Sequence, residues 1–214
     1  MLDNPGLDFH TTCPISKKTS LYLIIIIIII IIMCRRCGKE SEPIQYVTAA
    51  CEQLAPTQHA KRHDAVAKVI HQKLAKAAEL IDDKSLYYKY TPANVLENEN
   101  FKLYGNRSIL TDKTTSFNRP DITFMNKKTK NAFLLDIAVP NTHNLAKIIT
   151  DKQSKYQEMA NEICAMWKQK AAQVIPIVIS FTGAIPNSLS QSLTRPNLHR
   201  NIYIYIYIYN CKNL

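Results

Sequence analysis

The chain has 214 residues, enough for one folded domain of ordinary size with short appendages. Its 27 lysines and arginines exceed its 17 aspartates and glutamates, which gives a formal net charge of +10. This excess favours a polyanionic partner, either a nucleic acid or an anionic membrane surface, although solvated basic faces without a ligand would give the same count. Six cysteines and four glycines argue against a disulfide-dense secreted scaffold, so reduced thiols or a metal site fit better.

The N-terminal 33 residues form a low-complexity segment that ends in an apolar run at 21–33, with nine consecutive isoleucines. A run of about thirteen apolar residues is shorter than the roughly 20 that cross a hydrocarbon core. No small-residue cleavage site follows, because the next residues are Cys34-Arg35-Arg36-Cys37. We therefore expect hydropathy to suggest a membrane span that does not exist, and a small membrane-anchored basic protein stays as an alternative. The tail at 201–214 contains a strict Ile-Tyr alternation, and both ends are typical of translated simple-sequence DNA.

Between these ends, helices and strands are expected in a defined order. An amphipathic helix is predicted at 59–81, because apolar residues recur at helical spacing. A weak strand near 102–110 follows, then a hairpin over 119–138, a long helix over 143–171, a strand at 174–181 and a short helix at 186–194. Pro176 indicates an edge strand or a bulge. The predicted order is α-β-β-β-α-β, and the crossover through the long helix implies a parallel final strand.

The predicted hairpin carries one aspartate on each strand, Asp121 and Asp136, with fourteen residues between them. Apolar residues surround both, so a buried charge there requires strong compensation. Mg²⁺ is a usual compensation, because hard cations prefer carboxylate oxygens. Two carboxylates holding Mg²⁺ in a strongly basic protein indicate phosphodiester chemistry on a nucleic acid.

The predicted long helix carries two lysines near its apolar face. Lys152 lies inside a stripe that runs from Leu145 to Trp167, and Lys155 lies beside it, directly before Tyr156. A lysine on an apolar face either extends its ammonium group to solvent or meets an anion, which here could be the two aspartates or a bound phosphate. Burial favours Lys152 as the lysine that acts at this site, whereas the position directly before Tyr156 favours Lys155.

These residues resemble the PD-(D/E)xK signature of restriction-endonuclease-like nucleases. Pro120-Asp121 and Asp136-Ile137-Ala138 match it, except that Ala138 stands where the family usually has lysine. The version with the lysine moved to the next helix is similar to the C-terminal endonuclease of site-specific non-LTR retrotransposons. Arg119 before Pro-Asp and the Lys152–Tyr156 helix carry this likeness. It implies a restriction-endonuclease-like α/β domain over 59–200, with Asp121, Asp136, Lys152, Lys155 and Tyr156 as catalytic residues.

The same resemblance implies a zinc knuckle upstream, over 34–58. Cys34-x2-Cys37 is a good chelating turn, and Cys51 would be a third thiolate ligand of Zn²⁺. The family's histidine is replaced by Tyr46, a poor ligand as a neutral phenol, so the knuckle is degenerate; His59 or His63 could substitute. Arg62-His63-Asp64 resembles a recurring element that contacts nucleic acid or caps the helix, and Arg119 would hold the DNA backbone.

By this resemblance the chain is a nuclear, Mg²⁺-dependent nicking endonuclease from a larger polyprotein, associated with target-primed reverse transcription. Its partners would be DNA and the element's RNA, with no small-molecule substrate. The fragment has no candidate polymerase, because Asp82-Asp83 lacks the surrounding residues of a reverse transcriptase. A catalytically inactive nucleic-acid-binding remnant is the alternative, and the loss of histidine at Tyr46 favours it.

Overall fold

The computed structural model describes residues 33–42, 46–47, 51–82, 86–140, 144–181 and 183–196. The isoleucines of the apolar run and the Ile-Tyr tail lie outside these ranges. Within them, no helix is both long and apolar enough to cross a membrane.

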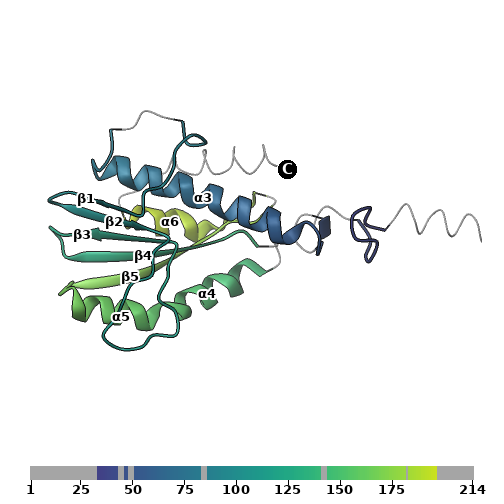
Figure 1. Cartoon of the computed structure of the whole chain (residues 1–214). Coiled ribbons are helices and arrows are strands. Elements are labelled where there is room, and N and C mark those ends of the chain that lie inside the picture. The colour runs from purple at the N-terminus through teal and green to yellow at the C-terminus, as the bar shows by residue number, and fades with distance from the viewer. Residues whose placement is uncertain are drawn as a thin grey trace, which may run out of the picture.

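A mixed five-stranded sheet with helices on both faces forms the body of the protein (Figure 1). The strands lie in chain order across the sheet; β1 to β4 are antiparallel to their neighbours, and β5 runs parallel to β4. The strands are β1 (Val95–Glu97), β2 (Phe101–Gly105), β3 (Ile122–Asn126), β4 (Asn131–Ala138) and β5 (Ala171–Val178). The helices are α3 (Ala55–Ala77), α4 (Leu145–Lys155), α5 (Gln157–Met166) and α6 (Asn187–Thr194).

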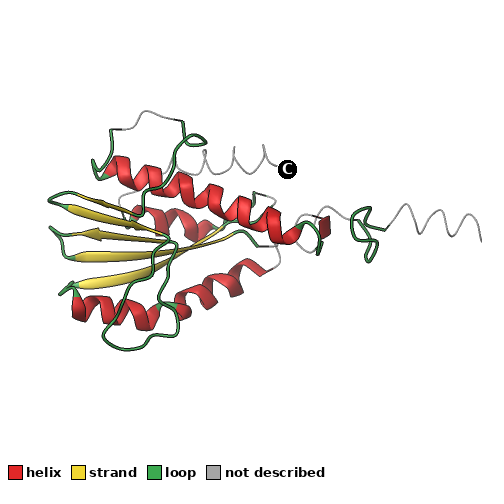
Figure 2. Ribbon diagram, viewed as in Figure 1, coloured by secondary structure: helices red, strands yellow, loops and turns green. Residues whose placement is uncertain are grey.

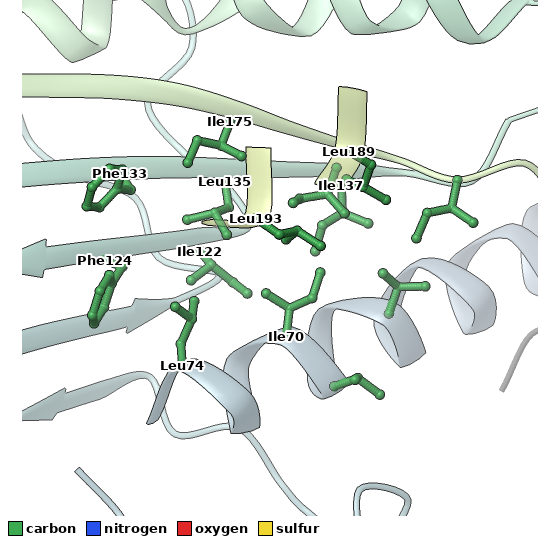
Figure 3. Close-up of a cluster of buried hydrophobic side chains, with 14 of the residues drawn as sticks. Ile70, Leu74, Ile122, Phe124, Phe133, Leu135, Ile137, Ile175, Leu189 and Leu193 are labelled. Carbon is green, nitrogen blue, oxygen red and sulfur yellow. The ribbon is translucent and has the colours of Figure 1, made fainter. Parts of the chain in front are cut away.

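The sheet separates two layers of helices. Helices α3 and α6 cover one face, while α4 and α5 cover the other, as Figure 2 shows in red against the yellow strands. The larger core lies under α3 and α6, where Ile70 and Leu74 of α3 meet Leu135 and Ile137 of β4 (Figure 3). The smaller core lies under α5, where Met159 and Ile163 pack with Leu134.

Strand β4 is buried on both faces. Successive side chains of a strand point to opposite faces, so Leu135 and Ile137 join the larger core while Ala132 and Leu134 join the smaller one. This double burial explains why residues 132–137 are apolar apart from Asp136 and do not alternate with polar residues. Asp136 shares the face of Leu134, which α4 and α5 cover.

Most of the predicted elements are confirmed. The 59–81 helix is present and begins earlier, at Ala55, with a proline in its first turn. The hairpin, the parallel final strand and the short C-terminal helix all form, and Pro176 lies on the edge strand β5 as expected.

Strand β1 was not predicted, because Asn98 and its neighbours suggest only a loop. The structure uses Asn98 to form the tight β1–β2 turn: its Oδ1 accepts hydrogen bonds from the backbone N–H groups of Asn100 (3.0 Å) and Phe101 (2.7 Å). Its amide also donates to the Ala78 carbonyl beyond α3, at 2.9 Å.

The single long helix predicted over 143–171 is wrong. The helix breaks at Tyr156, whose backbone angles (φ −107°, ψ 8°) are not helical, and α5 ends at Met166. Tyr156 is only 2% exposed, and its hydroxyl donates to the Arg119 carbonyl at 2.8 Å, so its side chain is anchored across the sheet face. The continuous apolar stripe is also wrong for its first part, since α4 buries none of its residues.

Replacement of Leu135 by alanine tests whether β4 is the centre of the core. Leu135 is fully buried, so we expect Leu135→Ala to lower the free energy of unfolding by about 2–5 kcal/mol. Leu110→Ala, at a side chain 84% exposed, is the control and should change it by less than about 0.5 kcal/mol. Urea denaturation measures both; equal effects would contradict this placement of the core.

Candidate functional site

Asp121 and Asp136 are neighbours at one end of the β3–β4 pair. Ile122 pairs with Leu135, so the register places residue 121 opposite residue 136, one step beyond the last pair. The Asp121 carboxylate continues the strand ladder there, because its Oδ2 accepts a hydrogen bond of 2.6 Å from the Ile137 N–H. The two residues, called the carboxylate pair below, are the two that the sequence placed on one hairpin.

Asp136 is the buried member of the pair. Only 3% of the residue is exposed, and its Oδ2 forms an ion pair with the Lys152 ammonium group from α4. Burial raises the pKa of Asp136 and Lys152 lowers it, with a net shift upward from the ordinary value. Lys152, predicted either to extend into solvent or to meet an anion, meets this carboxylate.

The negative charge of Asp121 is balanced by a side chain from the opposite helix layer. His63 of α3 lies with Nε2 at 3.1 Å from Asp121 Oδ2, and its Nδ1 lies at 3.1 Å from Asp64 Oδ1. A histidine between two acceptors donates from both nitrogens and is therefore cationic. Asp121 first, with Asp64, raises the pKa of His63 to about 9. Burial raises the pKa of Asp121, but His63 and the Ile137 N–H outweigh it, and the net shift is downward.

The prediction from sequence gave His63 a contact with nucleic acid, a helix-capping role or a place as substitute zinc ligand, and missed its contact with Asp121. A signal was available: positions 63, 66, 70 and 74 fall on one helical face, and Val66, Ile70 and Leu74 form the buried stripe of α3. A histidine at the end of such a stripe faces the end of the sheet that α3 covers.

Lys155 contacts aromatic rings, whereas Tyr156 contacts a backbone carbonyl and also lies beside Asp136. The Lys155 ammonium group lies over the rings of Phe117 (5.0 Å) and Tyr156 (4.6 Å). The buried Tyr156 hydroxyl donates a hydrogen bond to the Arg119 carbonyl, and burial raises the pKa of this phenol. Tyr156 packs in the core, and its contact with a phosphate stays a prediction.

The two arginines predicted to contact DNA have different environments. Arg119 is exposed beside the carboxylate pair, and its Nε donates to the Asn106 carbonyl (3.2 Å) and side-chain oxygen (3.0 Å). Arg62 is only 6% exposed, and its Nε donates to the Gln58 carbonyl at 3.1 Å. Arg119 is thus placed for a surface contact, whereas Arg62 takes part in the packing of α3, and its contact with DNA stays a prediction.

The carboxylate pair presents oxygen atoms to one another at the end of the sheet. Its oxygen atoms come from adjacent strands, are partly shielded from solvent, and carry negative charge that Lys152 and His63 balance from opposite sides. Carboxylate oxygens at such a position suit a hard divalent cation.

The cysteine cluster consists of Cys34, Cys37 and Cys51, whose sulfur atoms all lie within 4.8 Å of one another. Cys34 and Cys51 are buried, and a tight turn between Cys34 and Gly38 brings Cys37 to the same side. Three thiols at this separation can bind a metal ion.

Tyr46 lies beside the cysteine cluster, with its hydroxyl 3.2 Å from the Cys37 sulfur. This hydrogen bond is the main cause that lowers the pKa of Cys37 to about 7, which favours the thiolate. Of the two histidines considered as a fourth ligand, His63 is instead engaged by Asp121 and Asp64.

Comparison of the sequence with protein-family models and with curated proteins gives no match.

The His63–Asp121 contact predicts a pH-dependent stability in the presence of EDTA. The pKa of His63 in the folded chain, about 9, exceeds the unfolded value near 6.5. The stabilisation is therefore complete below about pH 6.5 and is lost as the pH rises through about 9. Titration of the ring nitrogens by NMR measures this pKa directly.

Two variants separate the partners of His63. Asp121→Asn should return its pKa toward 6.5, while Asp64→Asn, at an exposed carboxylate, should lower it less. A wild-type ring that titrates near 6.5 would contradict the contact.

Proposed function

We propose that the chain is a Mg²⁺-dependent endonuclease that nicks DNA. The observation that supports this most is the ion pair between Lys152 and Asp136. A lysine from a helix, two aspartates from adjacent strands and a net charge of +10 together match what cleavage of a polyanion requires.

Each residue of the site has a specific task in this proposal. Asp121 and Asp136 hold the cation, which when bound would polarise a phosphate oxygen and lower the pKa of an attacking water. Lys152 stabilises the negative charge that develops on the phosphate, since its ammonium group already lies at the carboxylate pair. His63 orients the Asp121 carboxylate, and the exposed Arg119 holds the DNA backbone.

The finer assignment to a restriction-endonuclease-like domain, and to a retrotransposon-derived fragment, is part of the same proposal. The structure contains the expected α-β-β-β-α-β order, with β1 added at the sheet edge and the crossover divided into α4 and α5. A nuclear site of action, a role in target-primed reverse transcription and an RNA partner follow only from this assignment.

An inactive nucleic-acid-binding remnant is the second candidate. Tyr46 at the position of a zinc-binding histidine favours it, because it shows a departure from the family in the cysteine cluster. The membrane-anchored alternative depends on the isoleucine run, which lies outside the described residues.

We also propose that the cysteine cluster binds Zn²⁺ through three thiolates, with the Tyr46 phenol oxygen as a weak fourth ligand. The hydroxyl already lies on the sulfur cluster, and Tyr46 has its backbone carbonyl hydrogen-bonded to the Cys51 N–H at 2.8 Å. An oxygen ligand in place of an imidazole should make zinc binding weaker than at a site with histidine.

Supercoiled plasmid in Mg²⁺ tests the nuclease. We expect the wild-type chain to nick it and Asp136→Asn to be slower by at least about 100-fold, because one of the two cation ligands is lost. Absence of nicking by both proteins, with salt-sensitive DNA binding retained, would support the inactive remnant instead.

The two lysines provide a matched comparison in the same assay. Lys152→Ala should slow nicking by about 100-fold, since it removes the ammonium group at Asp136, while Lys155→Ala should cost less than about tenfold. Rates are compared at equal folded fraction, because Lys152→Ala leaves a buried carboxylate unpaired. Greater loss with Lys155→Ala would reverse the assignment.

Metal content under reducing conditions tests the zinc proposal. We expect about one equivalent of Zn²⁺ in the wild-type chain and a loss in Cys51→Ser. Tyr46→His should bind Zn²⁺ at least about tenfold more tightly, and Tyr46→Phe more weakly, than the wild type. Equal affinity of Tyr46→Phe and the wild type would show that the phenol is not a ligand.

A further inference from the structure

A cavity of about 340 Å³ opens beside the carboxylate pair, between α3 and the ends of β2 and β3. Asp121 belongs to both sites, because it lines this cavity and also lies opposite Asp136. The volume is at the small end of the range for ligand pockets. The cavity, called the α3 cavity below, shares His63 and Asp121 with the mechanism described above, which gives its other lining residues no task.

The innermost polar group of the α3 cavity is His71. Its side chain is 1% exposed, its Nδ1 lies 2.8 Å from the Tyr90 hydroxyl, and its Nε2 has no hydrogen-bond partner among the described residues. Burial lowers the pKa of His71 to about 4, despite the nearby Ala93 carbonyl, so the ring is neutral. A buried, unpaired ring nitrogen costs free energy unless a ligand or water completes it.

Gly105 packs directly against this edge of the His71 ring. A Cβ atom at position 105 would lie 3.1 Å from His71 Nε2 and 3.0 Å from the Ala93 carbonyl oxygen. The ring edge that carries the unpaired nitrogen therefore lies close to Gly105, which lines the cavity with it, and this close approach requires a residue without a side chain.

The remaining lining favours an uncharged, hydrogen-bonding, partly apolar ligand. The carboxylates of Asp64 and Asp121 are balanced by the cationic His63 and Lys68, so the lining offers an anion such as free phosphate no net attraction. Asn94 and Asn106 contribute amides, and Ala67, Pro92 and Ile122 contribute apolar surface. A nucleobase has this combination of an apolar face and a polar edge.

We propose that the α3 cavity takes one nucleobase of the bound DNA strand, next to the phosphate held at Asp121 and Asp136. This inference rests on the proposed nuclease function, which places a phosphate at the carboxylate pair. The base is connected to that phosphate through a single sugar, and Asp121 is the common wall of the two sites. To enter, the base leaves the helical stack, so an unpaired or mismatched base is favoured over a paired one.

Nuclear magnetic resonance of the full chain with ¹⁵N-labelled histidine tests this in Mg²⁺. The probes are deoxyadenosine monophosphate, deoxyribose 5-phosphate and inorganic phosphate. Only the first should give a saturable shift of the His71 ring nitrogens, because only it carries a base. An unmoved His71 signal with deoxyadenosine monophosphate, or an equal shift with deoxyribose 5-phosphate, would overturn the proposal.

Variants of α3 make the test specific to the cavity. Ala67→Trp fills it and should weaken deoxyadenosine monophosphate binding by at least about tenfold, whereas Ala77→Trp, at an exposed position on the same helix, should not. Asn94→Ala, at an exposed position that does not disturb the core, should also weaken binding. Unchanged affinity in both Ala67→Trp and Asn94→Ala would overturn the proposal.

The result is separable from that of the nicking assay. If the chain binds the mononucleotide in the cavity but does not nick plasmid, the base site is supported and the nuclease function is contradicted. If nicking depends on Asp136 but the mononucleotide does not shift the His71 signal, the nuclease function is supported and the base site is contradicted.

Discussion

Two carboxylates placed side by side at the end of the β3–β4 pair are the constraint on which the site depends. Asp121 and Asp136 repel each other, and the burial of Asp136 adds a desolvation cost that the chain must offset. The offset comes from both helix layers: Lys152 reaches Asp136 from α4 on one face of the sheet, and His63 reaches Asp121 from α3 on the other. The site therefore exists only where the two layers meet at the sheet end.

The break between α4 and α5 is a consequence of this arrangement. Tyr156 is buried and tied to the Arg119 carbonyl, two residues before Asp121, so the residue that interrupts the helix also fixes the segment that carries one carboxylate. With α5 packed in the smaller core, α4 contacts the sheet mainly near its edge and directs Lys152 at Asp136. Helix α4 leaves its surface open to solvent, where a polyanionic partner, as proposed, could contact it.

The sequence predicted those parts that depend on local pattern. Helical periodicity identified α3, the paired aspartates identified the hairpin, and Pro176 identified an edge strand. Contacts distant in sequence were harder to predict. Whether Lys152 meets the aspartates, a phosphate or solvent was left open, and the contact of His63 with Asp121 was missed, because each depends on how a helix packs against the sheet. The helix break at Tyr156 left no local signal, since neither glycine nor proline marks it. Strand β1 was missed because its residues look like a loop until β2 pairs with them.

Binding of Mn²⁺, a paramagnetic substitute for Mg²⁺, measured by electron paramagnetic resonance most directly tests whether the carboxylate pair holds a divalent cation. The wild-type chain and Lys155→Ala should each bind about one equivalent at the site, and Asp121→Asn and Asp136→Asn should each lose it. Equal Mn²⁺ affinity in Asp136→Asn and the wild type would contradict the assignment, since the cation would then be held elsewhere.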